Sequence, residues 1–194
     1  MNVLHLDTSA LGTYSISRQL TAAIVAQLQR DGVAGQVSYR DLAAEPLPHW
    51  LPNPDTASDN AQRDAAVLEQ FLAADIVVLG APMYNFSIAS QLKAWLDRVM
   101  VAGRTFRYGP NGPEGLAGGK RVIIASTRGG IYSEGAAAGM DFQEPYLRAA
   151  FAFIGITDVE FVRAEGVAMG EAGREAALKQ AHATIGALAL RKAA

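Results

Sequence analysis

The chain has 194 residues, of which 50% are hydrophobic and 19% are charged, and its formal net charge is −2 at pH 7. This composition favours one packed domain over residues 1–194 and excludes a disordered chain, and the near-neutral charge argues against general binding of nucleic acid or anionic membranes. Because the chain contains no cysteine, it has no disulfide framework, cysteine nucleophile or thiolate metal site.

The first part of the chain predicts two strands and one helix. Residues 3–6 form a short apolar run that is typical of a strand. A helix is predicted over 17–30, where Leu20, Ile24 and Leu28 recur on one face. Residues 37–40 predict the second strand. Four of the eight prolines lie in residues 42–60, and they forbid both a helix and a central strand. We interpret this segment as an ordered surface excursion because it carries Leu47, Trp50 and Leu51. Its anchors are taken to be His49 and Trp50, with capping of a neighbouring subunit's site as the alternative.

The middle of the chain continues the alternation of strand and helix. A helix is predicted over 61–73, followed by a strand over 75–80 whose unbroken apolar core is typical of a parallel strand covered on both faces. A second helix is predicted over 88–101. Residues 105–119 are rich in glycine and proline and predict a hairpin or loop insertion, in which Phe106 would pack.

The last part of the chain holds two more strands and two more helices. Residues 121–125 form another buried-strand run, and a helix over 142–154 follows. A strand over 157–162 precedes a final helix over 171–191.

Strands separated by helices predict a parallel sheet with right-handed crossovers. Five such strands fit a flavodoxin-like doubly wound α/β fold with strand order 2-1-3-4-5 and helices on both faces. Ligands of such sheets bind outside the carboxyl ends of the strands. We therefore expect the site where three loops meet, over residues 7–17, 81–87 and 126–134.

The first of these loops joins a strand to a helix and is rich in hydroxyl side chains. Free backbone N–H groups and the helix dipole at such a junction attract an anion. Ser9, Ser15 and Ser17 can add hydroxyl donors, while Ile16 offers only its backbone N–H. The loop lacks the glycine–lysine pattern of a nucleotide-triphosphate site. We predict a phosphate held by neutral donors; simple helix capping by Ser15 or Ser17 is the alternative.

The second loop carries a methionine, two aromatic residues and an amide. A flat ring system needs apolar faces to pack on and backbone donors at its polar edge. The residues that can supply both are Met83, Tyr84, Asn85 and Phe86. The alternative is a hydrophobic turn that only covers the sheet.

The third loop contains paired glycines, which let a backbone approach a ligand closely. Its candidate residues are Thr127, Arg128, Gly129 and Gly130, with a flexible turn as the alternative. The convergence of the three loops favours flavin mononucleotide (FMN), with the phosphate in the first loop and the isoalloxazine ring between the other two.

Several segments, in order along nearly the whole chain, resemble the FMN-dependent NADH-azoreductases of bacteria, also described as NADH:quinone oxidoreductases. The most specific combination is that of Pro82-Met83-Tyr84-Asn85-Phe86, Thr105-Phe106-Arg107-Tyr108 and Asn111-Gly112-Pro113-Glu114-Gly115-Leu116. Other such segments include Tyr14-Ser15-Ile16-Ser17 and Thr127-Arg128-Gly129-Gly130. The sequence departs from the family at Ile16, a position that is often polar there, and in residues 42–60, a segment that is longer in relatives.

The resemblance implies one FMN per subunit, bound by Ser9, Ser15 to Ser17, Met83 to Phe86 and Thr127 to Gly130. It implies hydride transfer from NADH, or NADPH, through FMN to a quinone or an azo compound, in a homodimer with two sites at its interface. The protein would supply orientation and electrostatics, so no catalytic acid or base is assigned. Tyr132 and Phe106 are candidates for stacking on the substrate, with packing in the hairpin as the favoured interpretation of Phe106.

Three other functions are considered. A flavodoxin-type electron carrier would be strongly acidic, which the net charge of −2 argues against. A flavin-free hydrolase or phosphatase would need a nucleophile and a base, and no cysteine or histidine lies near the first loop. An FMN reductase that hands its flavin to a partner remains open.

The sequence shows no sign of export, membrane insertion or metal binding. The N-terminal residues lack a basic region and reach an acid at Asp7, and no apolar run approaches the ~18 residues of a membrane span. His5, His49 and His182 lie far apart without metal-binding spacing, and His5 is interpreted as a core residue. We expect a cytoplasmic protein without metal.

Overall fold

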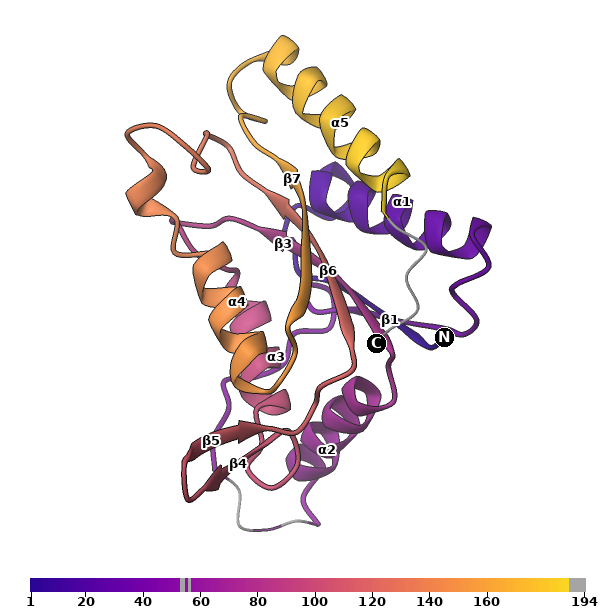
Figure 1. Ribbon diagram of the computed structural model, residues 1–194, viewed down its shortest axis with the longest axis vertical. Helices are drawn as coiled ribbons and strands as arrows, with labels where there is room; N and C mark the ends of the chain where they lie inside the picture. Colours follow the sequence, from indigo (N-terminus) through magenta and orange to yellow (C-terminus); the bar gives the residue numbers. More distant parts are fainter. Residues whose placement is uncertain (53–54, 56, 189–194) are drawn as a thin grey trace.

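The computed structural model describes residues 1–52, 55 and 57–188, and it shows a parallel sheet with helices on both faces (Figure 1). All neighbouring strands of this sheet pair in parallel, and their order is β2-β1-β3-β6-β7. Every residue of the central strands β3 and β6 is buried, as expected for strands covered on both faces. The strands of the sheet are β1 (Val3–Asp7), β2 (Val37–Asp41), β3 (Ile76–Pro82), β6 (Arg121–Thr127) and β7 (Asp158–Ala164).

The five-stranded flavodoxin-like sheet predicted from the sequence is therefore present. Its labels differ from the order 2-1-3-4-5 because β4 (Phe106–Gly109) and β5 (Gly112–Gly115) take two numbers between β3 and β6. These two strands form a separate antiparallel hairpin. The prediction of a hairpin or loop insertion over 105–119 is thus confirmed as a hairpin.

The helices cover the two faces of the sheet unequally (Figure 1). One face carries α1 (Ile16–Arg30) and α5 (Glu171–Gly186), and the other carries α2 (Asp59–Leu72), α3 (Ser90–Val99) and α4 (Glu144–Phe153). The last helix ends at Gly186, five residues before the predicted end, and residues 189–191 of that prediction lie outside the described residues. No helix in the described part of the chain has both the length and the apolar character needed to cross a bilayer.

The proline-rich segment between β2 and α2 is anchored differently from the prediction. Leu42 and Leu47 are buried, whereas His49 is exposed and Trp50 is 46% exposed. The prediction of His49 and Trp50 as anchors is therefore wrong, whereas the burial of Leu47 agrees with the prediction of an ordered segment. Part of the predicted excursion, at positions 53, 54 and 56, lies outside the described residues.

The β4–β5 hairpin packs against the turn that follows α4. A Cβ atom at Gly115 would lie 2.1 Å from the backbone nitrogen of Gly155, so only glycine permits this approach. The amide of Ala117 donates to the carbonyl of Ile154 over 2.9 Å. The ring of Phe106 lies 4.7 Å from that of Phe153, centroid to centroid, which confirms its predicted packing role.

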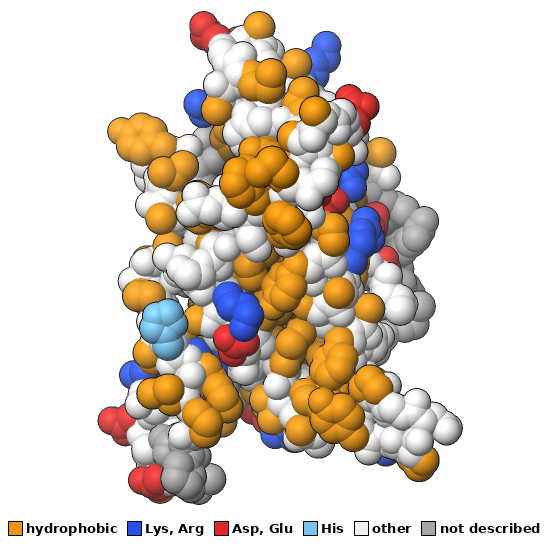
Figure 2. All heavy atoms as spheres, turned by 90° about the vertical axis from the view of Figure 1, so that its left-hand side faces the viewer, with side chains coloured by type: hydrophobic (Ala, Val, Ile, Leu, Met, Phe, Trp, Pro, Cys, Tyr) orange, Lys and Arg blue, Asp and Glu red, His pale blue; other side chains and the backbone are white. Residues whose placement is uncertain are grey.

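Hydrophobic side chains gather on the face that lies to the left in Figure 1 (Figure 2). The elements on that side include α4, the loop that precedes it and the hairpin. The large apolar side chains exposed on the loop and around the hairpin include Tyr108, Leu116, Ile131, Met140 and Phe142. Contiguous apolar surface of this kind is a common sign of contact with another molecule.

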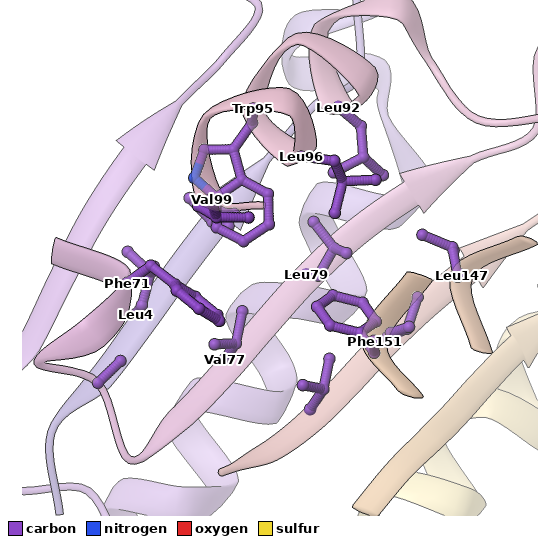
Figure 3. Close-up of a cluster of buried hydrophobic side chains, with 14 of the residues drawn as sticks. Leu4, Phe71, Val77, Leu79, Leu92, Trp95, Leu96, Val99, Leu147 and Phe151 are labelled. Carbon is purple, nitrogen blue, oxygen red and sulfur yellow. The ribbon is translucent and has the colours of Figure 1, made fainter. Parts of the chain in front are cut away.

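The larger hydrophobic cluster lies between the sheet and the helices α2, α3 and α4 (Figure 3). Its centre is an edge-on contact between Phe71 and Trp95, whose ring centroids are 5.6 Å apart. Phe151 of α4 packs over Leu79 of β3 in the same layer. Because this layer fixes β3 against β6, it also fixes the loops that follow them.

Candidate functional site

The three loops predicted to form the site lie side by side at the carboxyl ends of β1, β3 and β6. The hydroxyl of Thr8 donates to the carbonyl of Gly80 over 2.7 Å, which ties the first loop to β3. The amide of Met83 donates to the carbonyl of Thr127 over 2.8 Å, which ties the second loop to the third. The prediction that these segments converge on one rim is therefore confirmed by contacts.

The first loop ends at the N-terminus of α1. Ser15 is the N-cap, and its side-chain oxygen accepts the amide of Arg18 over 3.3 Å. The amides of Ile16 and Ser17 have no partner inside the helix, since the first amides of any α-helix lack one. These two N–H groups, together with the positive end of the helix dipole, can hold an anion.

The serine side chains of this loop are buried as a group. Ser9, Ser15 and Ser17 are each at most 2% exposed. The hydroxyls of Ser15 and Ser17 lie 3.0 Å apart, and that of Ser9 lies 3.2 Å from the hydroxyl of Tyr84. The capping interpretation of Ser15 is thus correct, yet capping uses only its oxygen as an acceptor. The contact between Ser15 and Ser17 uses one of their two hydroxyl protons and leaves the other for a ligand, so capping and anion binding are compatible.

A buried polar cluster lies behind the first loop. Asp7 accepts the hydroxyls of Thr21 and Tyr39 over 2.8 and 3.0 Å, and His5 faces it at 3.7 Å. Burial alone would raise the pKa of Asp7, but the neighbouring His5 ring and the hydrogen bonds from Thr21 and Tyr39 outweigh it and lower that pKa. Burial and the charge of Asp7 raise the pKa of Tyr39 to about 12. The side chain of His5 is 12% exposed and lies in β1 beside this acid, with its ring 4.9 Å from that of Tyr39, centroid to centroid.

Two residues that the sequence analysis did not assign to the site support the first loop. A Cβ atom at Gly80 would lie 3.1 Å from Oδ1 of Asp7 and 3.5 Å from the hydroxyl of Ser17, so glycine leaves the room that the loop needs. Arg18 pairs with Asp41 and with the backbone of Ser9. A sequence signal for Arg18 did exist, because a cation in the first turn of a helix is disfavoured by the dipole unless it is paired.

The second loop is a tight turn with unusual backbone angles. Asn85 and Phe86 have φ values of +48° and +72°, in the left-handed region that non-glycine residues rarely adopt. The amides of Tyr84 and Ser87 each donate to the other residue's carbonyl, over 2.9 and 3.1 Å. This pattern is that of a type I′ turn, in which the two central amides are left unpaired. Strain of this kind is found where a site requires a particular backbone orientation.

The side chains around this turn form an apolar wall. Phe86 is 38% exposed, and its ring meets that of Tyr132 edge-on at 6.1 Å between centroids. Beside Tyr132 lies an open cavity of about 610 Å³, with Gly130, Ile131 and Met169 among the residues that line it. A planar ligand at the rim would therefore have apolar surface on one side and space beside it.

The third loop is held in place by a buried ion network. Arg128 is 1% exposed, and its guanidinium lies 2.7 Å from Glu144, 3.0 Å from Asp141 and 3.0 Å from Glu165. Glu165 also accepts the amides of Tyr132 and Ser133. Burial would raise the pKa of Glu165, but these hydrogen bonds and Arg128 lower it. The guanidinium of Arg128 is thus paired with carboxylates of the protein itself. The sequence analysis did not predict its partner Glu165.

The backbone of the same loop is partly free. The carbonyls of Gly129 and Gly130 accept the amides of Ala168 and Gly166 over 3.1 and 3.0 Å. Their own amides have no acceptor within the described part of the chain. A Cβ atom at Gly130 would lie 3.3 Å from the ring of Tyr132, so the glycine keeps this edge open. Thr127 is 7% exposed at the end of β6.

Comparison with known proteins places this chain among flavodoxin-like folds. A family model described as flavodoxin-like fold matches residues 1–189. A relative from Methylocella silvestris, named FMN-dependent NADH:quinone oxidoreductase, is 57% identical over 194 aligned residues, which cover 93% of this chain and 95% of the relative. A protein of the same name from Stenotrophomonas maltophilia is 59% identical over 189 residues, covering 95% of this chain and 94% of that protein.

Solved structures also have this fold. The structure of azoreductase AzrA is 28% identical in sequence and superposes with a TM-score of 0.85, covering 97% of this chain and 100% of that one. An FMN-dependent NADH-azoreductase from Bacillus anthracis, solved in complex with FMN, is 25% identical and superposes with a TM-score of 0.81, covering 96% of this chain and 98% of that one.

Proposed function

This chain belongs to the flavodoxin-like fold family, and on that premise we propose that it is an FMN-dependent NADH:quinone oxidoreductase. The observation that carries the proposal is the position of two sets of donors at one rim. The unpaired amides and buried hydroxyls at the start of α1 lie beside the unpaired amides of the turn over 84–87, joined by the contact between Ser9 and Tyr84. One set suits a phosphate and the other suits the polar edge of a ring.

The first loop fits the phosphate of FMN. We assign this group to the hydroxyls of Ser9, Ser15 and Ser17 and to the backbone N–H of Ile16. A phosphate needs several donors, and these side chains are buried and uncharged, with the hydroxyls of Ser15 and Ser17 3.0 Å apart. Ile16 contributes through its amide alone, so the loss of a polar side chain at this position is tolerable.

The other two loops fit the ring of the same cofactor. We assign its apolar face to Met83, Tyr84 and Phe86 and its polar edge to the unpaired amide of Asn85. Thr127, Gly129 and Gly130 close the opposite side through their backbone. Arg128 completes the set as a positioning residue, because its guanidinium is committed to three carboxylates.

Bound FMN supplies a two-electron carrier that accepts a hydride equivalent from NADH and passes two electrons to the acceptor. The chain's own residues orient the reactants and stabilise charge. Backbone amides at Asn85 and Gly129 would donate to the polar edge of the ring and stabilise the negative charge of the reduced form. They are already fixed by the I′ turn and by the contacts of Gly129 with Ala168, so little reorganisation is needed. We assign no catalytic acid or base.

The finer features are part of the same proposal. We propose one FMN-binding domain over residues 1–194 that works as a homodimer in the cytoplasm and also reduces azo compounds. The exposed apolar face over α4 and the hairpin supports the dimer (Figure 2). The azoreductase names of two structural neighbours support the azo acceptors.

The test is anaerobic reduction followed by reoxidation. The full-length protein is loaded with FMN, and its flavin absorbance is followed while NADH and then a simple benzoquinone are added. We expect bleaching with NADH and full recovery with the quinone over many cycles. Bleaching without quinone turnover would point to an electron carrier, and release of reduced FMN into a filtrate would point to an FMN reductase. A protein that binds no FMN contradicts the proposal.

A further inference from the structure

Arg18 occupies a position where a cation needs a compensating partner. It is the third residue of α1, and no acidic side chain lies in the first turn of that helix. A positive charge at a helix N-terminus opposes the dipole. Its side chain, only 17% exposed, folds back over the first loop instead of extending into solvent. The partners that it finds there define its role.

The guanidinium of Arg18 joins three segments. Both terminal nitrogens donate to the carboxylate of Asp41, over 2.6 and 2.7 Å, in a bidentate pair. Nη2 also donates to the backbone carbonyl of Ser9 over 3.0 Å, and Nη1 donates to the hydroxyl of Tyr39 over 3.2 Å. The same residue thus connects α1, the loop after β1 and the end of β2.

The first loop is therefore held at Ser9 from two directions. On the β2 side, Arg18 donates to the backbone carbonyl of Ser9. On the β3 side, the hydroxyl of Tyr84 lies 3.2 Å from the side-chain hydroxyl of Ser9. A backbone site for an anion works only when N–H groups face the ligand and carbonyls face away. Arg18 keeps one such carbonyl turned into the protein.

The charge of Arg18 is already neutralised. Asp41 pairs with it directly, and Oδ2 of Asp7 lies 3.6 Å from its Nη1. Two carboxylates against one guanidinium leave no surplus positive charge for a phosphate. A lysine at this position would keep the positive charge but would lack the planar, forked set of donors that arginine has.

We propose that Arg18, locked by Asp41, is a positioning residue that sets the first loop for the phosphate of FMN and thereby selects FMN over riboflavin. The inference rests on the proposed function, since it takes FMN as the ligand of this loop. Arg18 acts through Ser9 and does not touch the cofactor.

A direct contact between Arg18 and the phosphate is the competing explanation. Its Nε is buried and has no hydrogen-bond partner among the described residues, so that atom could in principle serve a ligand. The two explanations differ in the sign of one mutational effect. Replacing Asp41 by Asn frees the guanidinium charge, which would strengthen a direct contact with phosphate. If Arg18 is a positioning residue, the same change loosens its side chain and weakens FMN binding.

The experiment compares the affinities of FMN and riboflavin, measured by quenching of flavin fluorescence on the flavin-stripped full-length chain. We expect Arg18→Lys to weaken FMN binding about tenfold, equivalent to about 1.4 kcal/mol, and to leave riboflavin binding unchanged. Asp41→Asn, which retains an oxygen for the amides of Ala43 and Ala44, should weaken FMN binding in the same direction. Arg104→Lys, in an exposed pair with Glu69 on α2, is the matched control and should change neither affinity.

Three results overturn the inference while leaving the proposed function intact. They are tighter FMN binding by Asp41→Asn, unchanged FMN binding by Arg18→Lys, and an equal loss of FMN and riboflavin affinity. Thermal unfolding of each stripped variant separates a local effect from loss of the fold, and Asp41→Asn decides the sign if Arg18→Lys unfolds. A wild-type chain that does not bind FMN overturns both proposals.

Discussion

The side-chain hydroxyls of Ser9 and Tyr84 lie 3.2 Å apart and join the loop after β1 to the turn after β3. The hydroxyl of Tyr84 also accepts the amide of Ala10 over 3.2 Å. One phenol thus connects the part of the site assigned to a phosphate with the part assigned to a ring. The two halves of the site are therefore mechanically coupled.

Removing this phenol is the first test of the coupling. Tyr84→Phe keeps the ring and deletes only the oxygen, which leaves the amide of Ala10 without its acceptor. We expect FMN affinity to fall by about 1 kcal/mol, the usual net value of a hydrogen bond, through faster release. Stopped-flow dissociation of FMN measures this. Tyr108→Phe, at an exposed tyrosine, is a control for the loss of a phenol. Equal release rates for both variants would show that the contact between Ser9 and Tyr84 does not contribute to FMN binding.

The buried serines should matter for the phosphate in particular. Replacing both Ser15 and Ser17 by Ala removes two hydroxyls and the N-cap, so we expect a loss of about 1 kcal/mol per hydrogen bond to FMN. Loss of the cap should lower the stability of the stripped protein by about 1 kcal/mol as well. Titration with FMN and thermal unfolding separate the two effects. Ser90→Ala, on the exposed start of α3, is the matched control, and undiminished FMN affinity in the double variant would place the phosphate elsewhere.

The acid behind the first loop predicts a pH dependence of stability. The folded-state pKa of Asp7 lies below its ordinary value of 3.8, so the unfolded chain binds its proton more readily than the folded chain. The resulting stabilisation is fully present above about pH 4 and is lost as the pH falls through the lower, folded-state pKa. Asp7→Asn should make the unfolding free energy less dependent on pH below 4. Urea unfolding across this range measures it, and parallel curves for the two proteins would contradict the prediction.

The contact between the hairpin and the turn after α4 predicts a strong effect on stability. Gly115→Ala would force a methyl group to within 2.1 Å of the backbone of Gly155, and overpacking of this kind costs about 1–3 kcal/mol or more. Chemical unfolding of the variant measures the loss. Gly139→Ala is the control, because a methyl group there would meet no atom within 4 Å. Gly112 has equal space, but its φ of +111° would strain any other residue. A stable Gly115→Ala variant would mean that the hairpin does not need this close approach.

The sequence predicted the sheet well because its strands are the simplest signal in the chain. The apolar core of β3 has no polar interruption and could belong only to a strand covered on both faces. The end of β6 was missed, since Ser126 and Thr127 are polar and look like loop residues. Both are buried, and Ser126 donates to the side chain of Gln143 over 3.1 Å. A polar residue that finds a buried partner can extend a strand, and the pattern alone does not reveal that partner.

The supporting residues of the site were harder to predict for a similar reason. Arg18 and Asp41 lie 23 positions apart, and they meet because β1 and β2 pair in a register that sets Asp7 opposite Asp41. The paired strands were predicted, but their register was not. Arg128 was expected to line the ligand because its neighbours are glycines. Its carboxylate partners come from two later segments, which no local pattern connects to it.

The hydrogen-bond ladder between β3 and β6 continues one step beyond the strands, through the amide of Met83 and the carbonyl of Thr127. The amide of Met83 should therefore exchange with deuterium as slowly as the sheet, even when no flavin is bound. The amide of Tyr84 donates to the carbonyl of Ser87 and should also be protected, whereas the amides of Asn85 and Phe86 should exchange almost at once. Two unprotected protons at positions 85 and 86, between the bonded amides of Tyr84 and Ser87, would mark where the rigid scaffold leaves backbone donors for the cofactor.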